Sequence, residues 1–344
     1  MQKIKHISVI RLSAMGDVAM IVPMLTILAK TYPDLKITMV SRPFFKPFFE
    51  GIENVQFLEA DVKVRHKRFG LLKLANEIHH LGVDAVADLH GVIRSKIITE
   101  YLKLKGLKTA SIDKGRREKK ALVSSENKKF VQLKSTHQRY AEVFAKLGFP
   151  INLKQPVFLM KKRLTPKLNA MLGVEMKKAV GIAPFAAHQS KMYPLDMMAK
   201  VVAQLDASDK YQVFLFGGGN KEGEILKKMA APFGNVINVA GKFSFEEELV
   251  LISNLDVMVS MDSGNGHLAA MYGVPVLTIW GVTHPFAGFT PFNQPMENQL
   301  VADRQAFPKI PTSVYGNKFP AGYEKAAGSI SVEAVVAKIK NLLY

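Results

Sequence analysis

Residues 256–270, DVMVSMDSGNGHLAA, decide the fold class of this chain. The apolar run 256–259 predicts a buried parallel strand, and residues 268–272 predict the first turns of a helix. Between them, Asp262, Ser263 and Gly264 predict a tight turn. A strand, a turn and a helix N-terminus in this order bring free backbone N–H groups and the positive end of a helix dipole together. The stretch therefore predicts a binding site for an anion such as a phosphate.

A second strand follows this site directly. Residues 274–280, VPVLTIW, predict the strand, and the polar loop 281–285, GVTHP, comes after it. The carboxyl ends of neighbouring parallel strands meet at one edge of a sheet, where ligands of open α/β folds bind. Two polar loops at that edge predict a sugar-nucleotide or another phosphate ligand.

Strand-like and helix-like runs alternate along the whole chain, which predicts βαβ units and parallel sheets. Residues 152–178 lack strong strand signals and contain two prolines, so we place a domain boundary there. We expect an α/β chain of two Rossmann-like domains, 1–172 and 173–330, with a C-terminal helix over 331–344. The predicted strands are 7–12, 37–40, 55–58, 85–89, 109–112, 179–183, 212–216, 236–239, 257–260 and 274–280, and helices are predicted over 21–32 and 71–81.

Composition narrows the class of protein. The 344 residues suit two domains, and 48% hydrophobic with 9% aromatic residues indicates a globular chain. Without cysteine the chain has no disulfide, thiolate metal site or thiol nucleophile. No His, Asp and Glu residues stand at metal-ligand spacing, so we expect no metal and no cofactor. The start of the chain has no signal-peptide pattern, and the apolar stretch 18–29 is too short to span a bilayer, so we expect a cytoplasmic protein.

Positive charge is concentrated in one region. Residues 61–140 carry 19 Lys and Arg against 8 Asp and Glu, within a net charge of +18 for the chain, and the densest part is 114–120, KGRREKK. A solvated loop, nucleic acid, an anionic membrane surface or an acidic substrate would each account for this charge. Aromatic residues are not interleaved with it and no nucleic-acid motif is present. We therefore rank a membrane surface or a phosphorylated acceptor above nucleic acid.

Three further loops follow predicted strands and carry candidate side chains. In 11–18, RLSAMGDV, Asp17 is either an N-cap carboxylate or a general base at a cleft. In 183–194, APFAAHQSKMYP, Lys191 is either an ordinary exposed lysine or a ligand of an anion, because a cation at a helix start opposes the dipole. In 216–224, FGGGNKEGE, Glu222 or Glu224 either binds ribose hydroxyls or serves as a helix N-terminal carboxylate. His267 is either a structural hydrogen-bonding residue or a phosphate ligand.

Taken in order, these loops resemble glycosyltransferase family 9, which includes the ADP-heptose:lipopolysaccharide heptosyltransferases. The resemblance covers most of the chain. It implies the GT-B fold, in which two Rossmann-like domains face a cleft and the C-terminal one holds most of the donor. It also implies inversion at the anomeric carbon without a metal. The matching stretches are 11–18 (RLSAMGDV), 88–95 (DLHGVIRS), 191–194 (KMYP), 217–222 (GGGNKE), 240–242 (AGK), 262–269 (DSGNGHLA) and 281–285 (GVTHP).

The same resemblance implies roles for single residues. Asp17 corresponds to the catalytic base and Lys191 to the residue that holds the donor phosphates. Donor binding falls to Glu222 at the ribose, Asp262 at the sugar, the amides of Ser263 and Gly264 at the pyrophosphate, and Gly217, Gly218 and His267 around them. We assign acceptor binding to Arg94, Arg116, Arg117, Lys119 and Lys120.

One departure from the family concerns the donor. Heptosyltransferases carry hydroxyl residues a few positions before the lysine that corresponds to Lys191, where the chain has Ala186 and Ala187. Either two contacts to the donor phosphates are missing or His188, Gln189 and Ser190 replace them. The expected reaction transfers heptose from ADP-heptose to a lipopolysaccharide-type glycolipid, by an enzyme bound peripherally to the inner face of the plasma membrane. A non-hydrolysing sugar-nucleotide epimerase of the same fold and a basic nucleic-acid-binding protein remain as alternatives.

Overall fold

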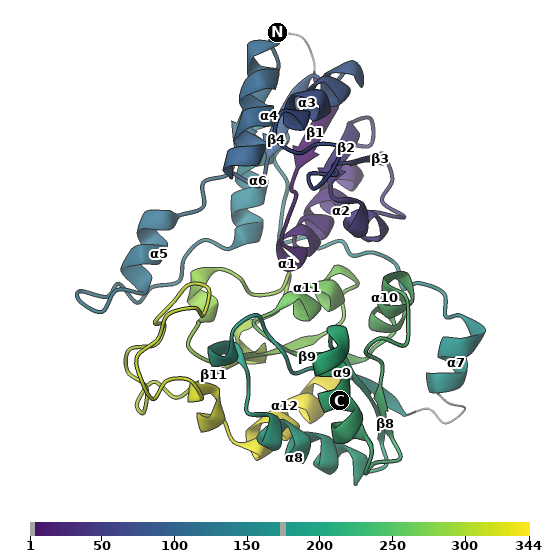
Figure 1. The fold of residues 1–344 in the computed structure, drawn as a ribbon, viewed down its shortest axis with the longest axis vertical. Helices are drawn as coiled ribbons and strands as arrows, with labels where there is room; N and C mark the ends of the chain where they lie inside the picture. The colour runs from purple at the N-terminus through teal and green to yellow at the C-terminus, as the bar shows by residue number, and fades with distance from the viewer. Residues whose placement is uncertain (1–3, 173–176) are drawn as a thin grey trace. The chain divides into compact units, whose positions relative to one another are not determined.

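Each half of the chain forms its own parallel β-sheet in the computed structural model, which describes residues 4–172 and 177–344 (Figure 1). One compact unit consists of Met1–Arg116 and Lys134–Leu159, and the other of Arg117–Leu133 and Met160–Tyr344. All ten predicted strands, and the helices predicted over 21–32, 71–81 and 331–344, occur within two residues of their expected ends. The prediction of an α/β chain with two parallel sheets is therefore confirmed.

The sheet of the first unit has the order β3-β2-β1-β4-β5, with every pair parallel. Ile10 on the central strand is level with Val40 and Asp88 on its neighbours, so the three strands end together. Helices cover both faces, which explains why the central strand is buried along its whole length. The strands are β1 (His6–Ile10), β2 (Lys36–Ser41), β3 (Val55–Glu59), β4 (Ala85–Asp88) and β5 (Lys108–Ser111).

Apolar faces of α3 and α4 form much of the core of the first unit. Leu74 and Ile78 of α3 pack with Ile98 of α4 against the sheet, and all three are fully buried. Each such side chain contributes about 1.5–3 kcal/mol to folding. The helices of this unit are α1 (Met15–Ala19), α2 (Ile21–Thr31), α3 (Gly70–His80), α4 (Ile93–Leu104) and α6 (Thr136–Leu147), with the 3₁₀ helix η1 (Pro43–Phe48), and α5 (Arg116–Leu122) begins where the unit ends.

The sheet of the second unit has the order β11-β10-β9-β6-β7-β8 and is also parallel throughout. The short edge strand β11 was not expected, because three residues give no recognisable alternation in the sequence. Gln299 at its start accepts a hydrogen bond from the indole of Trp280 at 3.0 Å, which aligns it with β10. The strands are β6 (Lys178–Ala183), β7 (Tyr211–Leu215), β8 (Val236–Asn238), β9 (Val257–Met261), β10 (Val276–Trp280) and β11 (Gln299–Val301).

The last helix of the chain completes the core of the second unit. Ser331 caps it by accepting the N–H of Ala334 at 3.1 Å, and Val335 and Ile339 are fully buried against α8 and the sheet. The helices are α7 (Pro166–Leu172), α8 (Leu195–Asp206), α9 (Gly219–Ala230), α10 (Phe245–Ser253), α11 (Gly264–Met271) and α12 (Val332–Leu343), and the 3₁₀ helices are η2 (Gln189–Lys191), η3 (Pro285–Ala287), η4 (Met296–Asn298) and η5 (Ala326–Ser329).

The limits of the two units differ from the expected domain limits. The predicted boundary between residues 172 and 173 lies at the edge of 173–176, which are outside the described residues, whereas the compact units divide after Leu159. Arg117–Leu133 also belongs to the second unit. Lys128 in this segment donates to the carbonyl oxygens of Lys309 and Pro311 at 3.0 and 2.6 Å. In the described parts of the chain no helix has both the length and the hydrophobicity to span a membrane.

Candidate functional site

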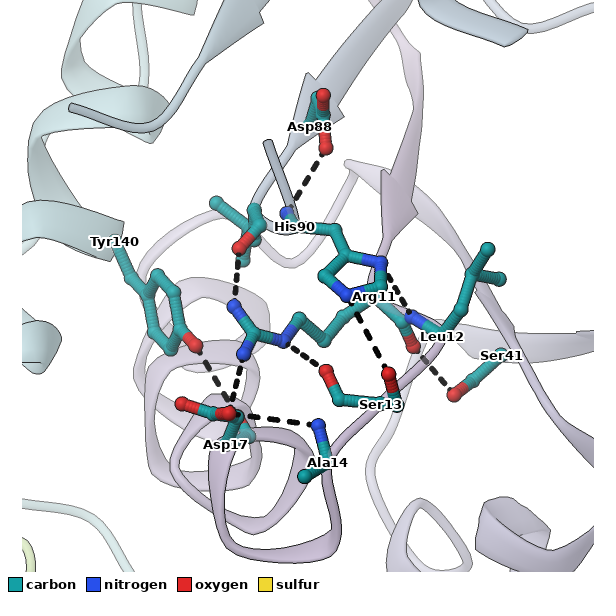
Figure 2. A network of polar contacts seen from close by, with 10 residues as sticks. Arg11, Leu12, Ser13, Ala14, Asp17, Ser41, Asp88, His90 and Tyr140 are labelled. Atoms are coloured by element: carbon teal, nitrogen blue, oxygen red, sulfur yellow. Dashed lines mark hydrogen bonds and ion pairs between the residues drawn. The ribbon is translucent and has the colours of Figure 1, made fainter. Parts of the chain in front are cut away.

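Asp17 lies in the first turn of α1, where its carboxylate pairs with Arg11 (Figure 2). Asp17 Oδ2 is 2.5 Å from Arg11 Nη2, and the Asp17 side chain is 29% exposed against 7% for Arg11. Ala14 is the residue that precedes the helix, and its N–H lies 3.4 Å from the same Oδ2. Asp17 is therefore not the N-cap residue itself, but its carboxylate caps the helix from the third position by accepting the N–H of Ala14, so a capping role is supported and the general base stays a prediction. In the described residues both side-chain contacts of the Asp17 carboxylate are made by Oδ2, which leaves Oδ1 able to accept a hydrogen bond from a ligand.

The buried Arg11 side chain holds Asp17 in place. Its Nε donates to the Ser13 carbonyl at 2.7 Å and its Nη1 to the Leu89 carbonyl at 2.8 Å. These bonds join the loops that follow β1 and β4. Tyr140, which is fully buried on α6, donates its hydroxyl to the backbone carbonyl of Asp17 at 3.2 Å. The carboxylate thus stands on a preorganised network, which is what a general base needs.

His90 lies beside this network as a neutral imidazole. Burial and the nearby cations, Arg11 foremost, lower its pKa to about 3. Its Nδ1 accepts the N–H of Leu12 at 3.4 Å, which places the proton on Nε2, 3.5 Å from the Ser13 hydroxyl. The fully buried Asp88 fixes this loop by accepting the N–H groups of His90 and Gly91, each at 2.9 Å.

A cavity of about 660 Å³ opens in the first unit next to His90 and Ser13. Five cationic side chains line it: Arg42, Lys63, Arg94, Lys96 and Arg116. They stand in loops and helix starts that follow the strands, at the carboxyl edge of the sheet. The remaining lining residues are Leu12, Ser13, Val62, His90, Gly91, Val92 and Ile93. Such a cavity suits an anionic ligand of moderate size.

The structure brings together only part of the set expected to bind the acceptor. Arg94 and Arg116 line the cavity, while Arg117, Lys119 and Lys120 lie along α5 and are not part of its lining. Lys119 is 8% exposed, and its Nζ lies 4.0 Å from the ring centroid of Phe289 within the second unit. The density of charge in the sequence therefore does not coincide with the cavity.

In the second unit, Lys191 and Asp262 lie together. Lys191 Nζ is 2.9 Å from Asp262 Oδ2, and the two side chains are 13% and 9% exposed. Thr283 donates its hydroxyl to the same oxygen at 2.9 Å. The three residues follow β6, β9 and β10, which are neighbours in the sheet. The alternative of Lys191 as an ordinary exposed lysine is wrong, and its charge near a helix start is balanced by Asp262 rather than left open.

The backbone around Lys191 is fixed by close contacts. The Ser190 hydroxyl donates to the Gly316 carbonyl at 2.5 Å, and the Ser190 carbonyl accepts the N–H of Val282 at 3.1 Å. Gly316 has φ of +84°, and a Cβ there would lie 2.5 Å from Cγ and Cδ of Lys191. Because its hydroxyl is used in this way, Ser190 does not replace the hydroxyl contacts missing at Ala186 and Ala187.

The N-terminus of α11 lies where the sequence predicts an anion site. The helix begins at Gly264, four residues earlier than predicted, with the extended Ser263 as its N-cap. The Ser263 hydroxyl is buried and has no hydrogen-bond partner within 4–172 or 177–344. His267 is buried one turn along the helix. The free N–H groups of the first turn and the Ser263 hydroxyl could together donate several hydrogen bonds to a phosphate.

The glycine-rich loop before α9 shows the second of the two arrangements expected for Glu222. Glu222 Oε2 accepts the N–H of Gly218 at 2.7 Å, so in this structure it acts as the helix N-terminal carboxylate. A Cβ at Gly217 would lie 2.9 Å from Leu226 and 3.2 Å from Phe185, so this glycine is required by packing. At Gly218 a Cβ would meet nothing within 4 Å, which leaves room for a ligand.

Sequence reasoning missed several of these residues. Arg42 and Lys63 follow β2 and β3, and Lys96 lies in the first turn of α4, so the rule that ligands bind at the carboxyl edge would have found them. Thr283 lies in the predicted polar loop 281–285, but the sequence predicted no role for it. Gly316 lies in an irregular segment and has no signal in the sequence, because only the packing against Lys191 makes it special.

Comparison with known proteins places the chain among transferases. A family model described as glycosyltransferase family 9 (heptosyltransferase) matches residues 71–320. The chain is 25% identical over 293 residues to lipopolysaccharide heptosyltransferase 1 of Campylobacter coli, across 80% of this chain and 84% of the relative. That match favours a transferase over an epimerase or a nucleic-acid-binding protein.

Solved structures agree on the fold. The crystal structure of the glycosyl transferase family 9 from Veillonella parvula has a TM-score of 0.75 at 20% identity, covering 100% of this chain and 98% of that one. E. coli heptosyltransferase WaaC with ADP has a TM-score of 0.67 at 19% identity, covering 98% and 99%. The predicted GT-B fold is confirmed.

Proposed function

Because the chain belongs to glycosyltransferase family 9, the heptosyltransferase family, we propose that it transfers heptose from ADP-heptose to a lipopolysaccharide-type glycolipid. The transfer inverts the anomeric carbon and needs no metal ion. The observation that carries the proposal is the cluster of Lys191, Asp262 and Thr283 beside the N-terminus of α11. A relative that is solved with ADP supports a nucleoside diphosphate as the leaving group.

Donor binding uses this cluster in the second unit. The leaving diphosphate gains negative charge as the glycosidic bond breaks. Lys191 and the amides of Ser263 and Gly264 stabilise that charge, which is the role that a metal ion has in other transferases. When the phosphates draw the Lys191 ammonium away, Asp262 is left to accept hydrogen bonds from the donor sugar. Thr283 continues to hold the Asp262 carboxylate in place.

Acceptor activation uses the network in the first unit. Asp17 takes the proton from an acceptor hydroxyl while that oxygen forms its bond to the anomeric carbon and the bond to the diphosphate breaks. Attack from the face opposite the leaving group inverts the carbon. Arg11 keeps the carboxylate oriented, because its other two nitrogens are anchored to backbone carbonyls.

Acceptor binding uses the cavity of the first unit. Its five cationic side chains suit the phosphates of a glycolipid, and Ser13 and His90 connect its lining to the Asp17 network. The acceptor is a membrane lipid, so the enzyme works as a peripheral protein at the inner face of the plasma membrane.

Two measurements test this function. Transfer is followed with ADP-heptose and a phosphorylated glycolipid in the presence of EDTA, and the anomer of the product is determined by NMR. Full activity in EDTA and an inverted anomer are expected. Loss of transfer that Mg²⁺ restores would contradict the charge stabilisation by Lys191 and the amides. A panel of nucleotide-sugars in a thermal-shift assay identifies the donor, since a ligand at a hundred times its Kd stabilises by about 2.7 kcal/mol.

A further inference from the structure

Exposed apolar side chains gather at one place on the first unit. Of fourteen large hydrophobic side chains that are exposed in the described residues, five lie within 64–72 and 93–97. Isolated exposed hydrophobic residues are ordinary, but a cluster of them marks a binding surface. The five are Val64 (78% exposed), Phe69 (88%), Leu72 (39%), Ile93 (79%) and Ile97 (42%), together called the apolar rim.

The two stretches of the apolar rim are neighbours in the fold. They lead into α3 and begin α4, and these two helices pack side by side (Figure 1). Both helices follow strands of one parallel sheet, so both start at its carboxyl edge. Ile93 of the second stretch and Lys63, which directly precedes the first, line the same cavity. The rim therefore lies beside the opening proposed for the acceptor.

The loop that presents Val64 and Phe69 is anchored by the residues between them. His66 is fully buried, with its Nε2 3.3 Å from Glu77 Oε2 on α3, and Arg65 forms an ion pair with the same carboxylate. A Cβ at Gly70 would lie 2.5 Å from the Arg65 carbonyl oxygen, so the loop closes tightly on the start of α3. Phe69 is thus held in solvent by an ordered loop.

Cations are frequent in and beside the two stretches of the apolar rim. Residues 61–73 and 93–97 contain seven Lys and Arg against the single acid Asp61. Exposed apolar side chains with cations close by in the chain suit the interface of an anionic bilayer, where apolar side chains enter the boundary below the headgroups and cations contact lipid phosphates. Apart from Arg65, none of these cations has an ion-pair partner in the described chain; they are Lys63, Lys67, Arg68, Lys73, Arg94 and Lys96.

We infer that the apolar rim docks the protein on an anionic lipid bilayer, with Phe69, Val64 and Ile93 inserted at headgroup level. A second copy of the chain would bring the same positive face against itself, which is unfavourable. A nucleic acid would match the positive charge, but single strands bind by stacking their bases on aromatic side chains, and the apolar rim is mainly aliphatic. The bilayer is the partner that matches both parts of the surface.

The inference deepens the proposed function and rests on it for the membrane-bound acceptor, but its test contains neither donor nor acceptor. The full-length protein is sedimented with vesicles of phosphatidylcholine alone or of two parts phosphatidylcholine to one part phosphatidylglycerol. We expect binding to the anionic vesicles only, weakened by salt. Phe69→Ser lowers the partition coefficient about tenfold, and loss of Lys67 or Arg68 lowers it about fivefold each. The matched control is Leu104→Ser, because Leu104 is also 88% exposed but lies at the far end of α4.

A fluorescence measurement reports insertion directly. Phe69→Trp and Leu104→Trp are compared on vesicles with brominated acyl chains, and the parent, whose single Trp280 is buried, gives the background. Quenching of Phe69→Trp alone is expected. The inference is overturned if anionic vesicles do not bind, or if binding is insensitive to Phe69→Ser and Phe69→Trp is not quenched. A dimer that Phe69→Ser dissociates would also overturn it, by assigning the surface to a second copy. Loss of transfer with normal vesicle binding would contradict only the proposed function.

Discussion

Substitution of Asp17 by Asn tests the general base, but it also costs stability, because the structure pairs Asp17 with Arg11. As an N-cap, Asp17→Asn would cost almost nothing, because Asn caps as well as Asp. Asp17 instead pairs with a 7% exposed Arg11 at 2.5 Å. Removal of one partner of a buried pair costs about 3–5 kcal/mol, while an exposed pair is worth about 0–1 kcal/mol. With Asp17 29% exposed, we expect a loss near 2 kcal/mol.

The effect of the same substitution on rate is expected to be far larger. A general base contributes roughly 10²–10⁴ in rate, and an amide cannot take the proton. The assay is single-turnover transfer at saturating donor, at a temperature where circular dichroism shows the variant folded. Donor affinity should be unchanged, because the donor residues belong to the other compact unit.

A matched control for Asp17→Asn is Asp196→Asn. Asp196 is an exposed acid in the first turn of α8, and no ion pair in the described residues involves it. Its loss should cost at most about 1 kcal/mol of stability and leave turnover unchanged. Turnover of Asp17→Asn within threefold of the parent would refute the assignment of Asp17 as the base.

Three further predictions follow from other contacts. Lys191→Ala should lower turnover roughly 10²–10³-fold, and Gly316→Ala should lower it by part of that factor, because its Cβ displaces the Lys191 side chain. The control for backbone strain in the same kinetic assay is Gly322→Ala, since Gly322 has the same φ of +84° but no atom near its Cβ. Arg42→Ala and Arg94→Ala should each raise the acceptor KM about tenfold, at roughly 1.4 kcal/mol per lost phosphate contact, and leave the donor Kd unchanged. Arg117→Ala and Lys120→Ala should change neither constant. Equal effects of the two pairs on the acceptor KM would place the acceptor elsewhere. The pKa of His90 is about 3 in the folded protein and 6.5 in the unfolded chain, so the stability that this residue contributes is fully present above pH 6.5 and falls as the pH drops toward 3. Urea unfolding followed by circular dichroism should give a free energy of unfolding about 2 kcal/mol lower at pH 5 than at pH 7 because of this group. His90→Gln should remove that difference.

The sequence predicts the sheets well because a parallel strand buried on both faces is a continuous apolar run. β9 and β10 are examples, and the loops that follow them, with Asp262 and Thr283, were found by the same reasoning. Helix starts were located less well, since the turn residue Gly264 already belongs to α11. Periodicity marks the middle of a helix and not its end.

Side-chain partners are the part that the sequence does not reveal. Asp17 and Arg11 are six positions apart, and nothing in that spacing shows that Arg11 is buried and also joined to Leu89 on another loop. Charge density was misleading for a similar reason. The cluster 114–120 contributes Arg116 to the cavity, whereas Lys114 precedes α5 and the cluster's other cations lie along that helix. The remaining lining cations come one or two at a time from three separate segments, at Arg42, at Lys63 and at Arg94 with Lys96.

Residues 117–133 have a consequence for how the gene of this enzyme can be recombined. Leu122 and Leu133 pack with Ala287, and Phe130 packs with Phe286 and His284, so a part of the C-terminal core is encoded upstream of α6. A chimera joined after Leu159 would combine this segment from one parent with the loop 284–289 from the other. When the two halves are exchanged as contiguous blocks, the core of the second unit would therefore contain 117–133 from one parent packed against 284–289 from the other. Exchange of donor specificity between relatives requires two grafted pieces, 117–133 and 160–344, taken together from the same parent.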